Sequence, residues 1–175
     1  MTKGDGSGPP MKIRRAQRSD REEWLRLRAL LWPECSLKEH KEEMAWFLKG
    51  RSKAVFVAAG QSSRLFGFLE ANIRPFADAC ETRPVGYIEG WYVDSEVRLQ
   101  GIGRRLVREA EDWARAKGCV EMGSDCLLKN DMSREAHLAI GYEERERLIH
   151  FRKWLTRRRA RIPKKKESSR VKRVG

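Results

Sequence analysis

Two glycines and an arginine form the most chemically suggestive stretch of the chain, Arg98-Leu-Gln-Gly-Ile-Gly103. It follows a β-branched and aromatic run over residues 85–93, which predicts a buried strand, and precedes a helical pattern that starts at Arg104. Glycine lets the backbone approach a ligand closely, and the first N–H groups of a helix are unpaired and carry partial positive charge. Strand, turn and helix in this order predict a pyrophosphate cradle. The alternative is a tight strand-to-helix turn without a ligand, since neither the P-loop nor the full dinucleotide fingerprint is present.

Two carboxylates stand where they could meet a cation. Glu89 interrupts the apolar run of residues 85–93, and an unpaired charge inside a sheet is unfavourable. It therefore either binds a cationic ligand or pairs with an arginine such as Arg98 or Arg104. Asp125 follows another predicted strand, where loops gather ligand contacts, although a turn-forming aspartate would look the same.

Length and hydropathy bound the class of protein. The 175 residues suit one domain with a buried core. No run of about 18 apolar residues could span a membrane, and residues 1–10 lack the apolar centre of a secretory signal. We therefore expect a cytoplasmic protein with no membrane partner. The composition predicts a disordered extension over residues 1–10, one domain over 11–155 and a disordered tail over 156–175.

The net charge of +13 suggests nucleic-acid binding, but the charge is concentrated in the tail. Residues 156–175 hold ten lysines and arginines against one glutamate, which leaves the first 155 residues at +4. Such a run is typical of a solvated extension, and weak non-specific contact with RNA or ribosomes is the alternative. The cysteines lack a Cys-x-x-Cys pair, as expected of reduced thiols in a cytosolic protein; they are Cys35, Cys80, Cys119 and Cys126.

Periodicity and capping signals predict a mixed α/β (α+β) domain. Strands are expected at residues 12–16, 54–58, 65–69 with a continuation to 73, 85–93, 119–126, 142 and 148–151. Helices are expected after capping boxes at Ser19 and Ser36, over residues 104–117 and from Ser133 to Ile140. The polar turn at residues 60–63 predicts an antiparallel hairpin. Periodicity assigns five aromatic side chains to the core: Trp24, Phe47, Phe56, Phe66 and Phe68.

With these elements in place, the chain resembles the GNAT superfamily of acetyl-CoA-dependent N-acetyltransferases. The cradle motif and the order of elements carry that resemblance over residues 11–155. Within the superfamily it is similar to the aminoglycoside 6'-N-acetyltransferases. Four further matches stand in the correct order: Leu27-Arg-Ala-Leu-Leu-Trp-Pro33, Glu89-Gly90, Gly118-Cys-Val-Glu-Met122 with Ser124-Asp125, and His137-x-x-x-Gly141-Tyr-Glu-Glu144.

The resemblance implies a mostly antiparallel sheet of six to seven strands, flanked by about four helices, and a homodimer. It also implies acetyl-CoA as cosubstrate. Trp91, Tyr92 and Val93 would offer backbone groups to the pantetheine arm. The pyrophosphate would be wrapped by Leu99, Gln100, Gly101, Ile102, Gly103 and Arg104, and Asn130 would contact the cofactor from the other side.

The acceptor implied by the resemblance is a polycationic aminosugar acetylated on its 6'-amine. Its site would be formed by Trp32, Phe76, Glu89, Asp125 and Glu146. Phe76 departs from the tyrosine of close relatives. His137 stands where the superfamily often has a tyrosine that protonates the leaving thiolate, so the general acid stays open among His137, Tyr142 and water.

Direct attack in a ternary complex is the mechanism we expect, because a polycation calls for carboxylates and acyl transfer calls for a deprotonated amine. Glu89 and Asp125 would be the catalytic carboxylates, and a backbone N–H near Val93 would polarise the thioester carbonyl. We expect neither a metal nor a covalent cysteine intermediate. Two alternatives remain: a GNAT enzyme that acts on a protein or peptide amine, and an RNA- or ribosome-binding protein that uses the basic tail.

Overall fold

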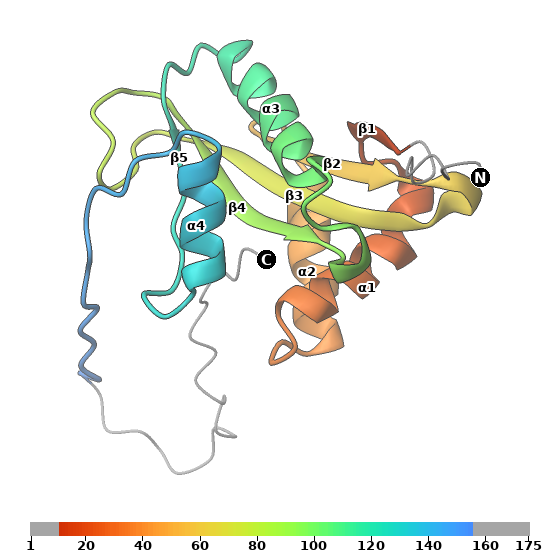
Figure 1. Ribbon diagram of the computed structural model, residues 1–175. Helices are drawn as coiled ribbons and strands as arrows, with labels where there is room; N and C mark the ends of the chain where they lie inside the picture. The colour runs from red at the N-terminus through yellow and green to blue at the C-terminus, as the bar shows by residue number, and fades with distance from the viewer. Residues whose placement is uncertain (1–10, 156–175) are drawn as a thin grey trace.

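Short β-rich runs assemble into a single sheet. In the computed structural model, which describes residues 11–155, the strands of this sheet lie in the order β1-β2-β3-β4-β5 (Figure 1). They are β1 (Lys12–Arg15), β2 (Lys53–Ala59), β3 (Leu65–Arg74), β4 (Val85–Val93) and β5 (Met122–Gly123). The first four are antiparallel to their neighbours, and β5 runs parallel to β4. The predicted hairpin of β2 and β3 is confirmed, and β3 continues to Arg74.

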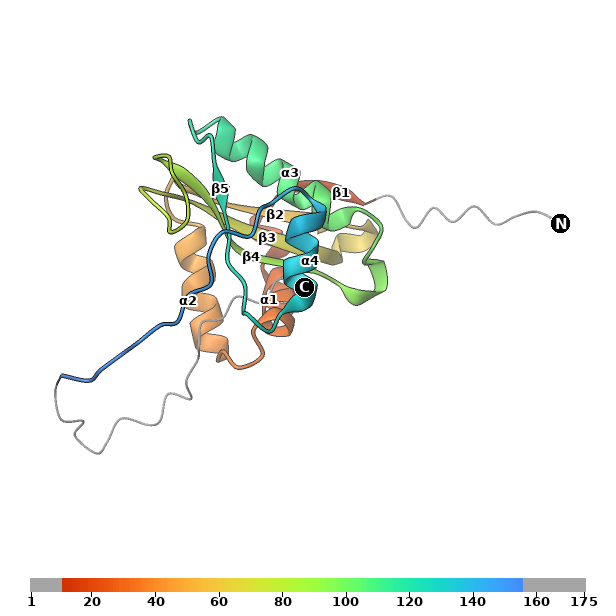
Figure 2. The same cartoon turned by 60° about the vertical axis from the view of Figure 1, so that its left-hand side comes forward.

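Four α-helices within residues 11–155 complete the mixed α/β fold, as predicted. They are α1 (Arg21–Leu31), α2 (Leu37–Phe47), α3 (Ile102–Arg115) and α4 (Asp131–Ala139). Helices α1 and α2 cover one face of the sheet and α3 covers the other, while α4 stands beside β4 and β5 (Figures 1 and 2). Among these residues no helix combines the length and apolarity needed to cross a membrane.

Each face of the sheet buries its own apolar cluster. Under α3 lie Ile88, Trp91 and Val93 with Leu106 and Val107. Under α1 and α2 a second cluster joins residues of both helices to β2 and β3; it includes Trp24, Leu27, Phe47, Val57 and Phe68. The predicted core aromatics Trp24, Phe47, Phe56 and Phe68 are buried, and Phe66 is half-buried against the first cluster.

Capping explains where two helices begin. At α2 the predicted box is confirmed, because Glu39 N–H donates to Ser36 Oγ at 3.2 Å and Ser36 N–H donates to Glu39 Oε2 at 2.8 Å. The predicted box at Ser19 is wrong. A 3₁₀ turn over Arg18–Asp20 precedes α1, and buried Asp20 accepts the Gln17 N–H at 2.6 Å. Asp20 also pairs with Arg14 at 2.6 Å. This ion pair holds Asp20 at the N-cap position of α1, which the sequence predicted for Ser19.

A β-bulge in β4 falls at Glu89. Glu70 of β3 pairs with Gly90, but the next residue of β3, Ala71, pairs with Ile88. Glu89 is therefore the extra residue, and the bulge inverts the alternation of the strand. As a result Ile88 and Trp91, three residues apart, pack in the same cluster beneath α3.

The expectation of six to seven strands is wrong for residues 11–155, which form five. The strand predicted at residues 119–126 shrinks to Met122–Gly123, and residues 142 and 148–151 form none. Ile149 and Phe151 are 80% and 92% exposed, and the segment runs away from the sheet (Figure 2). A β-rich pattern forms a strand only when a neighbouring strand accepts its hydrogen bonds, and this segment has no such neighbour within residues 11–155.

A buried ion pair links α1 to the sheet. Arg28 is 0% exposed and Glu70 is 1% exposed. The Arg28 guanidinium pairs with Glu70 and with Glu43 of α2, and it lies 4.5 Å from the ring centroid of Trp32. Trp24 Nε1–H donates to Glu70 Oε1 at 2.9 Å. Because a buried charge is stable only when it is paired, these contacts fix α1, α2 and β3 relative to one another.

Replacing Glu70 by glutamine should lower the free energy of unfolding by about 3 kcal/mol, because Arg28 then loses a buried counter-charge. Chemical denaturation should show a lower midpoint with an unchanged slope. The matched control is Glu42→Gln, which disrupts the exposed Lys38–Glu42 pair and should change stability by less than about 0.5 kcal/mol. A Glu70→Gln variant as stable as this control would contradict the assigned role.

Candidate active site

The glycine motif forms the start of α3, which begins at Ile102, two residues earlier than the sequence predicted. Gly101 is the N-cap with φ +76°, a left-handed conformation that favours glycine, and a Cβ there would meet nothing within 4 Å. The first helical hydrogen bond runs from Arg105 N–H to Gly101 O at 3.1 Å. The N–H groups of Ile102, Gly103 and Arg104 precede it and have no partner inside the helix. We call residues 98–104 the cradle.

The cradle is anchored to β4. Arg98 Nε–H donates to Val93 O at 3.0 Å, and a Cβ on Gly103 would lie 2.6 Å from the Trp91 ring. The first turn of α3 contains no carboxylate but carries Arg104 and Arg105. Since helix N-termini usually attract acidic side chains, this inverted charge pattern suits an anionic ligand.

Helix α4 closes the other side of the cradle. Asn130 caps α4 by accepting the Ser133 N–H at 3.1 Å. Arg98 Nη1 lies 3.3 Å from Met132 Sδ, and Arg104 Nη2–H donates to Ala139 O at 3.0 Å. The structure therefore gathers all the residues predicted to bind the cofactor on β4, the cradle and the start of α4.

Glu89 and Asp125 belong to one network of side chains. Arg74 Nε and Nη2 lie 2.9 and 2.7 Å from Glu89 Oε1. The same guanidinium lies 3.4 Å from the ring centroid of Tyr87, whose hydroxyl donates to Asp125 Oδ1 at 2.5 Å. The expected alternatives Arg98 and Arg104 are thus wrong as partners of Glu89. Burial and the bond to Asp125 raise the pKa of Tyr87 far above its ordinary value, so its hydroxyl stays protonated and donates.

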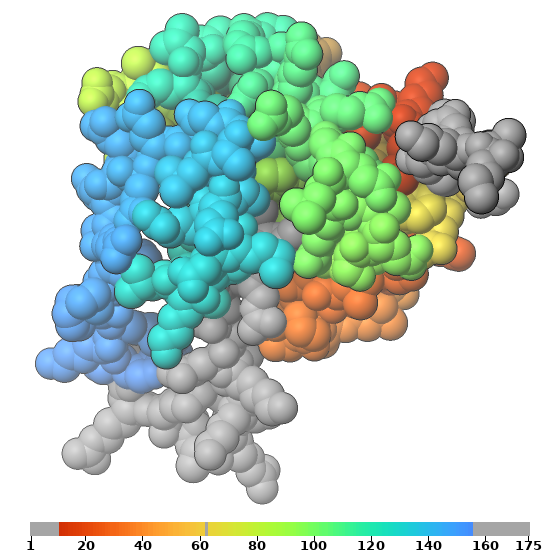
Figure 3. Space-filling view, viewed as in Figure 1, coloured from red at the N-terminus to blue at the C-terminus, as the bar shows by residue number. Residues whose placement is uncertain are grey.

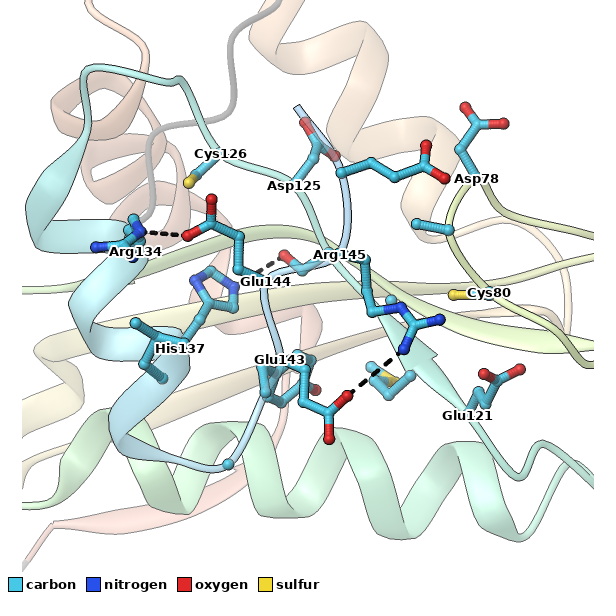
Figure 4. A pocket seen from close by; sticks show the side chains of 18 of the residues that line it. Asp78, Cys80, Glu121, Asp125, Cys126, Arg134, His137, Glu143, Glu144 and Arg145 are labelled. Carbon is cyan, nitrogen blue, oxygen red and sulfur yellow. Dashed lines mark hydrogen bonds and ion pairs between the residues drawn. The ribbon is translucent and has the colours of Figure 1, made fainter. Parts of the chain in front are cut away.

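A pocket of about 690 Å³ opens beside this network, along β5, α4 and the segment after Gly141 (Figure 4). A different hollow, a furrow between the atoms of α4 and those of the cradle, is visible in the space-filling view (Figure 3). Within residues 11–155 the lining of the pocket includes four arginines and eight carboxylates. The carboxylates are Asp78, Glu81, Glu111, Glu121, Asp125, Glu143, Glu144 and Glu146. The pocket is therefore acidic, although the whole chain is basic.

The pocket carboxylates differ in their partners. Arg147 and Arg134 bind Glu144 at 2.6 and 2.5 Å and lower its pKa to about 2. Glu121 accepts hydrogen bonds from Thr82, through both its backbone N–H and its hydroxyl. Asp78 and Glu146, by contrast, form no hydrogen bond or ion pair within the described part of the chain.

The predicted acceptor residues are only partly brought together. Asp125 and Glu146 line the pocket, whereas Glu89 lies behind Asp125 in the network and does not line it. Trp32 is buried, with its ring against Gly90, where a Cβ would lie 2.4 Å from Trp32 Cη2. Phe76 is 62% exposed.

His137 has a fixed environment that periodicity did not reveal. Its Nδ1 lies 2.7 Å from Ser133 O and its Nε2 lies 3.0 Å from Ser124 Oγ. The rings of Trp91 and Tyr142 meet it edge to face, each at 5.5 Å between centroids. Burial lowers the pKa of His137, which favours the neutral imidazole.

Sequence reasoning missed three members of the site: Arg74, Tyr87 and Ser124. Arg74 stands before a proline and Tyr87 lies in an aromatic strand, so each resembles ordinary scaffold. Their partners lie 13 to 38 positions away along the chain. The Ser124-Asp125 pair directly after a predicted strand was the available signal.

Comparison with known proteins agrees with this geometry. Residues 21–142 match the Acetyltransferase (GNAT) family. The chain is 42% identical over 144 residues to the aminoglycoside N(6')-acetyltransferase type 1 of Klebsiella aerogenes, an alignment covering 81% of this chain and 95% of the relative. It is 36% identical over 133 residues to the protein of the same name from Serratia marcescens, with 75% and 91% covered.

Solved structures give the same result. Aminoglycoside acetyltransferase AAC(6')-Iy in complex with the bisubstrate analog CoA-S-monomethyl-acetylneamine is similar with a TM-score of 0.79 and 34% identity, covering 83% of this chain and 99% of that one. AAC(6')-Ih from Acinetobacter baumannii also has a TM-score of 0.79 and 34% identity, over 84% and 100% of the two chains. The cradle at the start of α3 and the match over residues 21–142 lead to one assignment: the chain belongs to the acetyltransferase (GNAT) family.

Proposed function

We propose that this protein is an acetyl-CoA-dependent N-acetyltransferase that acetylates the 6'-amino group of aminoglycosides by direct transfer in a ternary complex. One observation carries the proposal: a cradle suited to an anion and an acidic pocket both adjoin α4, which contacts Arg98 and Arg104 of the cradle and lines the pocket with Arg134 and His137. The names of the relatives from Klebsiella aerogenes and Serratia marcescens support the same acceptor. Their high coverage means that the whole domain is shared.

The donor side fits acetyl-CoA. The unpaired N–H groups at the start of α3 and the side chain of Arg104 would hold its pyrophosphate. Beyond Tyr87, β4 has no strand neighbour on the β5 side within residues 11–155, so Trp91, Tyr92 and Val93 can offer backbone groups to the pantetheine arm and polarise the thioester carbonyl. Leu99, Gln100 and Gly101 would complete the wrap, and Asn130 would contact the cofactor from α4.

The acceptor side fits a polycation. Asp78 and Glu146 are available for ammonium groups, and Asp125 lines the same pocket. We assign Asp125 and Glu89 to orienting the reactive ammonium and accepting its first proton, directly or through water. The Arg74–Tyr87 bridge keeps both carboxylates in place before the substrate arrives.

We also propose a cytoplasmic homodimer. Acetyl-CoA is an intracellular metabolite, and the cysteines of residues 11–155 are free thiols, as suits a reducing compartment. Exposed apolar side chains after the pocket segment would be covered by a second copy; they are Leu148, Ile149, Phe151 and Leu155. The weak RNA contact of the basic tail concerns residues 156–175, which lie outside the described residues.

A panel of acceptors tests the proposed substrate. With acetyl-CoA present, aminoglycosides that carry a 6'-amine should release CoA thiol, and matched compounds with a 6'-hydroxyl should not. Lysine-rich peptides should react far more slowly. Their ammonium groups are spread along the chain, so fewer of them can enter one acidic pocket together. Faster turnover of peptides would favour the protein-acetylating alternative. Salt-sensitive RNA binding without any turnover would favour the RNA-binding alternative.

Neutralising the acceptor carboxylates tests the site. Each of Glu89→Gln and Asp125→Asn should lower kcat/KM by about 10- to 100-fold, since each removes a charge-assisted hydrogen bond. Glu96→Gln is the control, because Glu96 is exposed and pairs with Arg64 at 2.7 Å outside the pocket. Steady-state kinetics on folded variants would decide the matter, and a double variant with wild-type kcat/KM would refute the assignment.

The dimer prediction concerns the exposed apolar segment. Ile149→Glu combined with Phe151→Glu should convert a dimer into a monomer in sedimentation velocity, because each charge would be buried at the interface. Lys153→Glu changes an exposed charge in the same segment and should leave the dimer intact. A wild-type protein that sediments as a monomer would contradict the proposal.

A further inference from the structure

Ser124 and His137 form a hydroxyl–imidazole pair in the lining of the acidic pocket. They come from different elements: Ser124 directly follows β5, and His137 lies in the last turn of α4. Their polar atoms, Ser124 Oγ and His137 Nε2, are 3.0 Å apart. Both side chains are half-buried, so each can meet a ligand in the pocket while remaining fixed by its neighbours.

The tautomer of His137 follows from its second contact. Nδ1 lies 2.7 Å from the carbonyl oxygen of Ser133, which can only accept, so Nδ1 carries the proton. In the neutral ring Nε2 is then an acceptor, and the Ser124 hydroxyl donates to it. The opposite face of the Ser124 oxygen keeps its lone pairs for a proton from another group. This is the arrangement of an activated hydroxyl oriented by a fixed base.

The pair lies where donor and acceptor must meet. The His137 ring packs edge to face on Trp91 of β4, whose indole also touches the cradle at Gly103. Ser124 adjoins Asp125, which belongs to the acceptor network. The side chains of Ser124 and His137 thus stand between the two halves of the site, near the opening between β4 and β5.

Other groups of the site are less suited to exchange a proton during acyl transfer. Glu89 is bound by Arg74, Asp125 accepts from the Tyr87 hydroxyl, and Glu144 is bound by Arg134 and Arg147. Among them, Glu144 is a weak base, because Arg147 and Arg134 lower its pKa to about 2. His137 pairs instead with a hydroxyl, which can reverse its direction of donation.

We propose that Ser124 and His137 act together as the proton-transfer pair of the acyl-transfer step. The amine nitrogen bonds to the thioester carbonyl carbon, and its N–H proton passes to Ser124 Oγ as the Ser124 hydroxyl proton passes to His137 Nε2. As the C–S bond breaks, the imidazolium returns a proton through Ser124 to the leaving sulfur. The products are the amide and the free thiol, and the pair ends in its starting state.

This inference rests on the proposed acetyltransferase function, and it separates two roles. The carboxylates receive the first proton, which converts the bound ammonium into an amine. Ser124 contacts the reacting atoms and receives the second proton. His137 acts through Ser124 and is in that sense a positioning and storage group. Its lowered pKa agrees with this role, because a neutral imidazole is ready to accept a proton near neutral pH.

The test first establishes wild-type turnover of a 6'-amine aminoglycoside, and then compares four variants by rapid-mixing single-turnover acetyl transfer. Ser124→Ala and His137→Gln should each lower the transfer rate by about 100-fold or more. The double variant should be no slower than the worse single variant, because the two groups act as a unit. Ser124→Thr, which keeps the hydroxyl, should retain most of the rate. Ser95→Ala, an exposed serine outside the pocket, is the matched control.

The affinity for acetyl-CoA and the KM for the aminoglycoside should stay within about twofold in these variants, because proton transfer is a transition-state contribution. The proposal is overturned if Ser124→Ala transfers acetyl at near the wild-type rate, if its defect lies in KM, if Ser124→Thr is as slow as Ser124→Ala, or if the two single defects multiply. A wild-type protein without turnover of any aminoglycoside would instead refute the proposed function.

Discussion

The site depends on the separation of β4 from β5 after Tyr87. The two strands pair only at Gly86 with Met122 and at Tyr87 with Gly123, and then diverge. A strand that loses its neighbour leaves backbone groups that seek other partners. Here the cradle is anchored to β4 through Arg98 and Trp91, and the residues at and after β5 line the acidic pocket. The opening between the two strands would therefore suit an anionic donor on one side and a cationic acceptor on the other. The bulge at Glu89 adds to this by changing which face each side chain of β4 occupies.

Charge is separated within the domain in a way that the net charge conceals. The start of α3 carries positive charge from its unpaired helix N–H groups and its arginine side chains. The pocket along β5 and α4 is rich in carboxylates. An anionic donor and a polycationic acceptor would thus be drawn to different sides of the same opening. The basic tail accounts for most of the +13, and the first 155 residues are nearly balanced. Electrostatic recognition is therefore local.

Internal ion pairs fix the elements and side chains around the site. Arg28 and Glu70 lock α1 onto β3, and Arg74 at the end of β3 fixes Glu89 of β4. A carboxylate that is already oriented needs no rearrangement when charge develops in the reaction, which is how preorganised sites stabilise transition states. Trp32 contributes to this arrangement indirectly: its buried ring packs against Gly90 and the Arg28 guanidinium.

The sequence by itself determined the mixed fold, the hairpin, the position of β4 and the cradle, because periodicity, turn chemistry and glycine spacing are local properties. It also singled out Glu89 and Asp125 as candidate ligand contacts, since a charge in an apolar strand and an acid after a strand are visible without coordinates. Only the tertiary structure decided that Arg74 is the partner of Glu89 and that Ser124 meets His137. Those contacts join positions far apart in the chain. The bulge in β4 positions Glu89, and the two-residue strand β5 positions Ser124. For the same reason the final predicted strands did not form: a strand pattern is local, but a strand requires a neighbour.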